Sequence, residues 1–268
     1  MKQVVVICDG MADEPLDILG GKTPLEAADT PAMDQLAQMG RTGSLRTIPD
    51  GKYPGSEVGI MTILGYAPQQ LPWGRGALEA IGLDIALNPD EFAMRYILKS
   101  PEEFNHDDLA KQISAGKTHP LSDTTGLCIV PYTYSDCITN RFVRFWSRDR
   151  LRSFPTFAEI HSSHFNTPHP AAIVGAVPLL KGIAIAVGAD WIKPDGATGD
   201  LSTDYRAKGL AAIKALDSHD IVIVHIEACD WASHHKDPMA KVKAIENIDK
   251  HIIYPLINLF DGLLQCTS

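Results

Sequence analysis

Three apolar runs dominate the pattern of hydrophobic and polar positions along the chain. They are Val4 to Cys8, Ala171 to Val177 and Ile221 to Ile226, and all three are rich in β-branched residues. Runs of this kind, without polar alternation, are typical of strands buried on both faces of a parallel sheet. Asp190 to Lys193 is a shorter candidate strand.

Between these runs, apolar residues recur at helical spacing. Thr30 and Pro31 fit the N-cap and first position of a helix that ends at Gly40. Further helices are predicted to begin at Pro178, to span Thr203 to Leu216, and to run as one long amphipathic helix from Val242 to Leu256. The alternation predicts an α/β fold, a mostly parallel sheet with helices on both faces.

From about Ser100 to Pro170 the pattern loosens. This region carries five closely spaced arginines: Arg141, Arg144, Arg148, Arg150 and Arg152. Arginines in such a run can bind phosphate or carboxylate, although a solvated basic loop is the commoner explanation. We predict a small insertion here and not an independent domain.

Charge and composition narrow the classes of partner. The 268 residues carry 24 Lys and Arg against 33 Asp and Glu, a net charge of −9, which argues against nucleic acid or an anionic membrane as the main partner. No apolar run reaches membrane-spanning length, and Asp9 interrupts the first run too early for a signal peptide. Five cysteines without Cys-x-x-Cys spacing fit reduced thiols, so we predict a cytoplasmic protein.

Ser56 is the first candidate for chemistry. It follows Pro54-Gly55 and precedes an apolar helical run, which is the position of a helix N-cap. Free backbone N–H groups and the positive end of the helix dipole favour an alkoxide or a bound phosphate there. The alternative is that Ser56 only caps the helix.

Two strand ends carry possible metal ligands. Asp9-Gly10 follows the first strand, at the end where open α/β sheets place their ligands. Asp230 and His234, after the strand at 221–226, share one side of a helical turn or tight loop, and carboxylate with imidazole is a common pairing for Mn²⁺ or Zn²⁺. The plainer alternatives are a turn at Asp9, a helix cap at Asp230 and a surface histidine at His234.

Arg75 lies between Gly74 and Gly76. Small neighbours leave its guanidinium room for a bidentate contact with an anion. The segment is not a dinucleotide fingerprint, because Glu79 stands where a third glycine is needed and no strand precedes it. A plain surface arginine is the equal alternative.

Taken together, these motifs resemble the short-form cofactor-independent phosphoglycerate mutases of the alkaline-phosphatase superfamily, known from archaea and bacteria. The resemblance is dense over residues 1–95 and 171–260. Its matching stretches are Asp9 to Asp13, Gly20 to Leu25, Thr30-Pro31, Pro54 to Glu57, Leu64 to Tyr66, Gly74 to Gly76, Gly196 to Gly199, and His225 to Asp230 with His234.

The resemblance implies an alkaline-phosphatase-like core at residues 1–95 and 171–268, with a shortened cap region at 96–170. It implies two divalent ions, with Asp9 and Ser56 on one and Asp230 and His234 on the other. Manganese is the first expectation, with zinc, cobalt or magnesium as alternatives. The implied reaction interconverts 3-phosphoglycerate and 2-phosphoglycerate through a phosphoserine at Ser56, in glycolysis and gluconeogenesis, without bisphosphoglycerate. Arg75 and Lys181 would hold phosphate or carboxylate.

The chain departs from the family pattern near its end. That pattern continues to a strand ending in Asp-His, whereas this sequence closes with Leu263 to Ser268, so the implied metal shell is incomplete. We therefore expect a truncated product or a degenerate homologue with little mutase activity. Two further alternatives stay open: a related enzyme of the kind labelled phosphonopyruvate decarboxylase or homoserine kinase, and a non-catalytic metal- or phosphate-binding domain. Homo-oligomer formation is also left open.

Overall fold

The computed structural model describes residues 2–113, 116–134, 141–161, 171–259 and 264–267. The chain divides into two compact units, each assembled from separate segments. Unit 1 contains residues 1–45, 156–177 and 188–268, and unit 2 contains residues 46–155 and 178–187. Neither unit is continuous in sequence, so both depend on contacts between distant segments.

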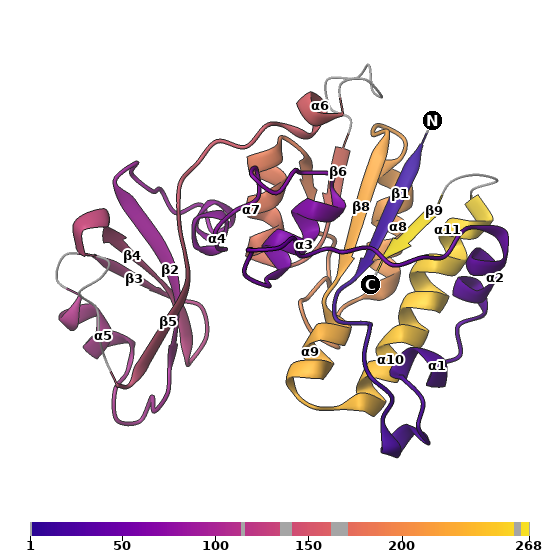
Figure 1. Ribbon diagram of the computed structural model, residues 1–268, viewed down its shortest axis with the longest axis horizontal. Helices are drawn as coiled ribbons and strands as arrows, with labels where there is room; N and C mark the ends of the chain where they lie inside the picture. The colour runs from indigo at the N-terminus through magenta and orange to yellow at the C-terminus, as the bar shows by residue number, and fades with distance from the viewer. Residues whose placement is uncertain (1, 114–115, 135–140, 162–170, 260–263, 268) are drawn as a thin grey trace. The chain divides into compact units, whose positions relative to one another are not determined.

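Unit 1 is built on a parallel sheet with the strand order β7-β6-β8-β1-β9 (Figure 1). In β1 and β8, Val4 lies opposite Val222 and Cys8 lies opposite Ile226, so the two strands end level with each other. The strands are β1 Gln3–Cys8, β6 Ala171–Val174, β7 Asp190–Ile192, β8 Ile221–Ile226 and β9 Leu264–Thr267. The three predicted apolar strands are confirmed, and every residue of β6 and β8 is buried.

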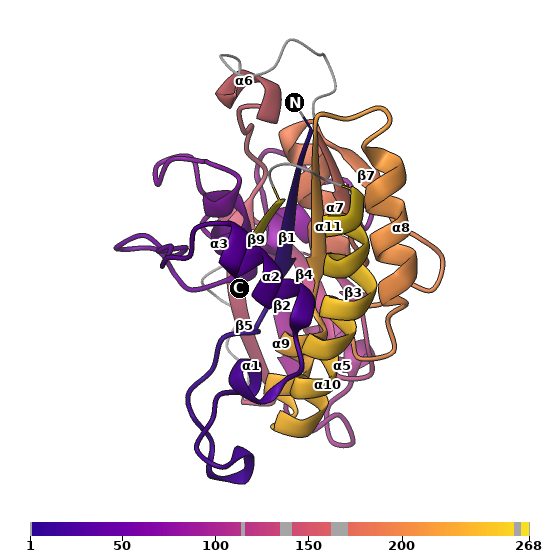
Figure 2. The same ribbon diagram turned by 90° about the vertical axis from the view of Figure 1, so that its right-hand side faces the viewer.

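Helices α8, α10 and α11 pack on one face of this sheet, which Figure 2 turns toward the viewer. Alternate strand residues such as Val6 and Val224 form one core with Ala212 of α8 and Ile245 of α10. Each large aliphatic side chain buried in this way contributes about 1.5–3 kcal/mol. The helices of unit 1 are η1 Asp17–Leu19, α1 Pro24–Ala27, α2 Pro31–Met39, α6 Phe157–Ile160, α8 Tyr205–Ala215, α9 Ala228–His234, α10 Pro238–Ile248, η3 Asp249–Ile253 and α11 Tyr254–Leu259.

The predicted long amphipathic helix is interrupted by a π-helical turn, η3, between α10 and α11. Asp249 begins this turn and is buried. Its carboxylate accepts hydrogen bonds from the backbone N–H groups of Ala32 (3.2 Å) and Met33 (2.7 Å) in the first turn of α2. Helix α2 does follow Thr30, as predicted, but these N–H groups are satisfied by an aspartate more than 200 residues away and not by the Thr30 side chain.

Unit 2 contains a four-stranded antiparallel sheet with the order β3-β4-β2-β5. Tyr96, Leu109, Cys128 and Val143 are buried in its core. Its elements are α3 Ser56–Ile63, α4 Gly76–Gly82, β2 Glu91–Leu98, α5 His106–Gln112, β3 Lys117–Pro120, β4 Thr125–Pro131, η2 Tyr132–Tyr134, β5 Val143–Arg150 and α7 Pro178–Val187. The region from Ser100 to Pro170, where the sequence pattern loosens, therefore contributes three of the four strands of this sheet, and its assignment as a small insertion stays a prediction.

The expected basic loop is likewise mostly a strand. Arg144, Arg148 and Arg150 lie within β5, and the Arg148 guanidinium stacks 4.4 Å from the centre of the Phe92 ring. Arg152 pairs with the buried carboxylate of Asp149 at 3.3 Å. Packing and ion pairing thus give Arg148 and Arg152 defined partners.

Helix α7 belongs to unit 2 because it packs closely on α4. A β-carbon at Gly182 would lie 1.7 Å from the Leu78 carbonyl oxygen, and one at Gly82 would lie 1.8 Å from the Pro178 carbonyl oxygen. Only glycine allows the two backbones to approach this closely. The compact units therefore divide the chain differently from the predicted core at 1–95 and 171–268 with a cap at 96–170. That division stays a prediction.

Candidate functional site

The predicted ligand Asp9 lies directly after β1, at the carboxyl end of the parallel sheet. Gly10, the next residue, has a φ of +73°, and a β-carbon there would lie 2.5 Å from the Asp230 Cα. Glycine is therefore required both by the backbone angle and by the close approach. This contact places the Asp9 turn against the first turn of α9, so the structure brings Asp9 and Asp230 together.

Helix α9 carries the other two predicted ligands. Asp230 and His234 lie one turn apart, with 3.6 Å between Asp230 Oδ2 and His234 Nε2. The side chains of His234 and Asp230 are 77% and 42% exposed, so an ion can reach both from solvent. The predicted placement on one side of a helical turn is confirmed.

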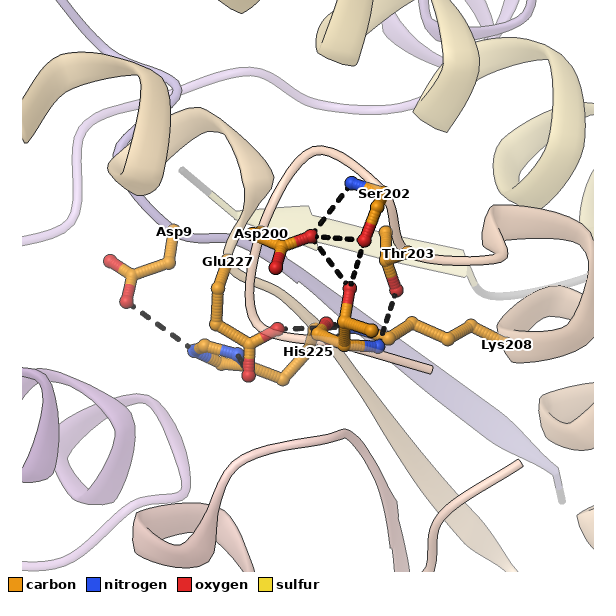
Figure 3. A network of polar contacts seen from close by, with 8 residues as sticks. Asp9, Asp200, Ser202, Thr203, Lys208, His225 and Glu227 are labelled. Carbon is orange, nitrogen blue, oxygen red and sulfur yellow. Dashed lines mark hydrogen bonds and ion pairs between the residues drawn. The ribbon is translucent and has the colours of Figure 1, made fainter. Parts of the chain in front are cut away.

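Behind Asp9 lies a buried network of charged side chains (Figure 3). The His225 ring stands between two carboxylates, with Nε2 3.5 Å from Asp9 Oδ2 and Nδ1 3.2 Å from Glu227 Oε1. Lys208 is fully buried and reaches Glu227 Oε2 at 3.0 Å. The chain of contacts therefore runs from Lys208 through Glu227 and His225 to Asp9.

Lys208 also holds two segments of backbone. Its ammonium group donates to the carbonyl oxygens of His225 (3.1 Å) and Thr198 (3.3 Å), in addition to Glu227. Three N–H donors thus meet three acceptors, which satisfies the hydrogen-bonding capacity of the buried ammonium group. Thr198 belongs to the loop after β7. In the same loop, Asp200 accepts a hydrogen bond from the Ser202 N–H at 2.7 Å.

The charges in this network shift the acidities of its members. Burial alone would lower the pKa of His225, but the carboxylates of Glu227 and Asp9 outweigh it and raise the pKa to about 9. For Glu227, burial alone would raise the pKa, but His225 and Lys208 lower it below its usual value. The imidazole is accordingly a cation between two anions at neutral pH.

Sequence reasoning did not single out His225, Glu227 or Lys208. The first two lie within a stretch that resembles the family, but their side-chain partners depend on the register of β1 and β8. Lys208 gave a weaker signal. It lies three residues after Tyr205 and four residues before Ala212, and all three are buried in α8.

Asp9, Asp230 and His234 provide two carboxylates and an imidazole, a donor set that suits Mn²⁺, Zn²⁺ and similar divalent ions. The close approach at Gly10 supports this fit, because it brings the two aspartate-bearing turns into contact. Within the residues that the structure describes, no three His, Cys, Asp or Glu side chains are grouped closely enough to hold an ion by themselves. These three side chains have the chemistry of metal ligands, but they are fewer than the ligands of a complete coordination shell.

Ser56 lies in unit 2, at the start of α3. The predicted N-cap position is wrong by one residue. Gly55 is the N-cap in an extended conformation, and its carbonyl accepts from the N–H groups of Val58 and Gly59 at 3.0 Å each. Ser56 is consequently the first helical residue and still lies at the positive end of the dipole.

The predicted anion-binding cations both have carboxylate partners in unit 2. Arg75 Nε lies 3.4 Å from the buried Glu57 carboxylate, and Arg75 Nη1 lies 3.9 Å from Glu79. Lys181 donates to Asp84 at 2.6 Å. These pairs show how each cation is held, and anion binding by Arg75 and Lys181 stays a prediction.

In the part of the chain that the structure describes, no helix is long and apolar enough to cross a membrane.

Comparison with known proteins extends the resemblance across nearly the whole chain. The profile of the metalloenzyme superfamily matches residues 1–264. The 2,3-bisphosphoglycerate-independent phosphoglycerate mutase of Methanosarcina barkeri is 33% identical over 328 residues, a match that covers 96% of this chain and 81% of that protein.

Solved structures agree with the sequence matches. The PH0037 protein from Pyrococcus horikoshii superposes with a TM-score of 0.75 at 30% identity, covering 97% of this chain and 75% of that one. The cofactor-independent phosphoglycerate mutase from Thermoplasma acidophilum shares the fold, with a TM-score of 0.61 at 21% identity over 99% of this chain and 86% of that one. The chain belongs to the metalloenzyme superfamily and, within it, to the family of the 2,3-bisphosphoglycerate-independent phosphoglycerate mutases.

Proposed function

We propose that this protein is an isomerase that interconverts 3-phosphoglycerate and 2-phosphoglycerate without bisphosphoglycerate. The single observation that carries the proposal is the Asp9-Gly10 turn packed against the helix that bears Asp230 and His234. The relatives named as phosphoglycerate mutases support the same reaction. A small phosphorylated three-carbon acid is thus the substrate, and the reaction serves glycolysis and gluconeogenesis in the cytoplasm.

Ser56 is the proposed nucleophile. Its Oγ attacks the phosphorus of 3-phosphoglycerate and loses its proton, the bond from phosphorus to the C3 oxygen breaks, and the C3 oxygen takes up one proton in exchange. The glycerate then turns within the site and its C2 hydroxyl oxygen attacks the phosphoserine with loss of its proton. The bond from phosphorus to Ser56 Oγ breaks, and Oγ takes up a proton to restore the hydroxyl. The first turn of α3 favours the negative phosphoryl group through its dipole and free N–H groups.

Membership of a metalloenzyme superfamily implies dependence on a divalent metal ion. We assign Asp9 and Ser56 to one ion and Asp230 and His234 to a second, with manganese as the first expectation. Bound ions of this kind lower the pKa of the nucleophile and neutralise the phosphoryl oxygens. Of these side chains, Asp9, Asp230 and His234 supply oxygen and nitrogen donors next to the carboxyl ends of β1 and β8 in unit 1.

Arg75 and Lys181 are proposed to hold the substrate's phosphate or carboxylate. Arg75 is paired with two glutamates, which restrict its guanidinium to one orientation and leave less of its charge for an anion. Lys181 has one partner, the exposed Asp84. A bound anion displaces this partner more easily than it displaces a buried glutamate.

The test is turnover of 3-phosphoglycerate followed by ³¹P NMR, with and without Mn²⁺. The chain should form 2-phosphoglycerate, and Ser56→Ala should reduce the rate by at least about 10³-fold because the nucleophile is lost. Ser44→Ala removes an exposed serine and should leave the rate unchanged. Turnover that persists in Ser56→Ala would contradict the mechanism, and robust turnover by the parent chain would overturn the expectation of a degenerate homologue.

A further inference from the structure

The side chains behind Asp9 are buried, charged and unused by the proposed chemistry. His225 is 1% exposed and Lys208 is 0% exposed, so neither can meet substrate directly without a rearrangement of the sheet edge. A buried ion pair is weak evidence for added stability, because desolvation offsets the attraction between the charges. The position of this network at the sheet's carboxyl end calls for another explanation.

Each member of the network is oriented by the next (Figure 3). Lys208 reaches one Glu227 oxygen at 3.0 Å, and the other Glu227 oxygen lies 3.2 Å from His225 Nδ1. The remaining ring nitrogen, Nε2, then faces Asp9 Oδ2 at 3.5 Å. An imidazole held at one nitrogen presents its other nitrogen in a fixed direction.

Glu227 connects this chain of contacts to the second pair of proposed ligands. It is the N-cap residue of α9, and it stands three residues before Asp230. Fixing Glu227 therefore fixes the start of the helix that carries Asp230 and His234. Through Lys208 and the Thr198 carbonyl, the same network also anchors the loop that follows β7.

We propose that His225 is a positioning residue that holds the Asp9 carboxylate in the orientation needed to bind a divalent cation, with Glu227 and Lys208 holding His225 in turn. Partners that orient a ligand in this way commonly change metal affinity 10- to 100-fold when they are removed. The inference rests on the proposed function, since it concerns the metal ligand Asp9. It adds three residues that act through Asp9 and not on the substrate.

Two substitutions of His225 separate positioning from packing. In His225→Gln the amide nitrogen can take the place of Nε2 beside Asp9. In His225→Asn the shorter amide can replace only Nδ1, which faces Glu227. Both changes remove the imidazole ring. If the role of His225 were purely structural, the two variants should therefore bind Mn²⁺ with similar affinity.

The experiment titrates chelator-treated protein with Mn²⁺ by isothermal calorimetry, after circular dichroism confirms folding. His225→Asn should weaken Mn²⁺ binding about 10- to 100-fold, whereas His225→Gln should stay within about threefold of the parent chain. His219→Gln is the matched control. It changes another buried histidine of unit 1, which pairs with Asp190, and it should leave the affinity unchanged.

Glu227→Gln provides a second, nearly isosteric variant if His225→Asn does not fold. It keeps an acceptor for Lys208 and should weaken Mn²⁺ binding severalfold. In an Asp9→Asn background, substitution of His225 should cause no further loss, because its effect passes through Asp9.

The outcomes distinguish the positioning role of His225 from the proposed function. If the parent chain binds Mn²⁺ and both His225→Asn and Glu227→Gln bind it equally well, the positioning role is overturned while the proposed function stands. If the parent chain neither binds Mn²⁺ nor converts 3-phosphoglycerate, the proposed function fails and the positioning role fails with it.

Discussion

Both units bury charged side chains, but they bury them for different structural purposes. In unit 1, Lys208 joins a helix, a strand end and a loop through three hydrogen bonds. In unit 2, the ion pair between Arg95 and Glu79 (3.5 Å) and the pair between Arg75 and Glu57 (3.4 Å) secure the segment around α4 and the start of α3. Lys208 holds three acceptors at once, whereas each of these arginines of unit 2 pairs with one or two glutamates.

The difference follows from the geometry of the two cationic side chains. A lysine has three donors that can point to three different segments, while an arginine fork suits one or two carboxylates. Unit 1 accordingly gains a fixed sheet edge, where Asp9 lies. Unit 2 gains a rigid support beside Ser56.

Removal of Lys208 should have the largest effect on stability. Lys208→Met leaves the buried Glu227 carboxylate without its lysine partner. It also leaves the backbone carbonyls of Thr198 and His225 without the hydrogen bonds that Lys208 donates. The free energy of unfolding should fall by about 3–5 kcal/mol. Urea denaturation followed by circular dichroism measures the loss. Lys214→Met, on the exposed side of the same helix, should change stability by less than about 0.5 kcal/mol, and an equal loss in the two variants would refute the cross-linking role.

Thiol labelling compares how readily the two units open. Burial raises the pKa of Cys128 in unit 2 and of Cys229 in unit 1 to about 12. At pH 8 the thiolate fraction should fall on the order of 10³-fold below that of an unfolded thiol, so iodoacetamide should label both slowly in the native protein.

As urea is added, mass spectrometry of tryptic peptides should show Cys128 reacting before Cys229. The reason is that the core around Cys128 is the smaller of the two, and smaller cores open at lower cost. Simultaneous labelling would mean that the units unfold together.

Gly182→Ala tests the close contact between α4 and α7. The added methyl group would overlap the Leu78 carbonyl oxygen, so α7 has to move away and stability should fall by about 1–3 kcal/mol. Gly59→Ala is the control, since the nearest atoms to its β-carbon are side-chain atoms at 3.8 Å or more. That change should stabilise α3 by up to about 1 kcal/mol. Equal melting temperatures for the two variants would contradict the helix contact.

The smallest stability change is expected for Lys181. Its partner Asp84 is 74% exposed, so Lys181→Ala should cost no more than about 1 kcal/mol in thermal unfolding. If Lys181 holds the substrate's anion, KM for 3-phosphoglycerate should rise about tenfold or more, which reflects loss of one charge-assisted contact. Asp84→Ala removes the same ion pair but should not raise KM. A KM unaffected in Lys181→Ala would remove this residue from the proposed site.

The parallel sheet was predictable because its signal is local. Strands β1, β6 and β8 are continuous apolar runs, and their burial on both faces follows from that pattern. The antiparallel sheet of unit 2 was not predictable in the same way. Its strand β5 is rich in arginine, and what holds those arginines, for example Phe92 under Arg148, comes from another strand.

The positions of the proposed ligands were predictable from the sequence, whereas the side chains that contact them were not. Asp9, Asp230 and His234 follow strand ends in recognisable motifs. Lys208 was overlooked because a lysine is almost never fully buried unless it is paired, and two of its three acceptors are backbone carbonyls, which any residue supplies. The aspartate that caps α2 is separated from it by most of the chain, so no local pattern could connect them.

The position of β1 has a consequence for synthesis of the protein on the ribosome. Its two neighbours in the sheet, β8 and β9, come from the last part of the chain. The intervening stretch of about 210 residues takes roughly 10 to 40 s to translate. During that interval the nascent apolar segment from Val4 to Cys8 has neither of its partner strands. Unit 1 therefore cannot complete its sheet until β8 and β9 have been synthesised, and the nascent chain should bind a chaperone through its first strand.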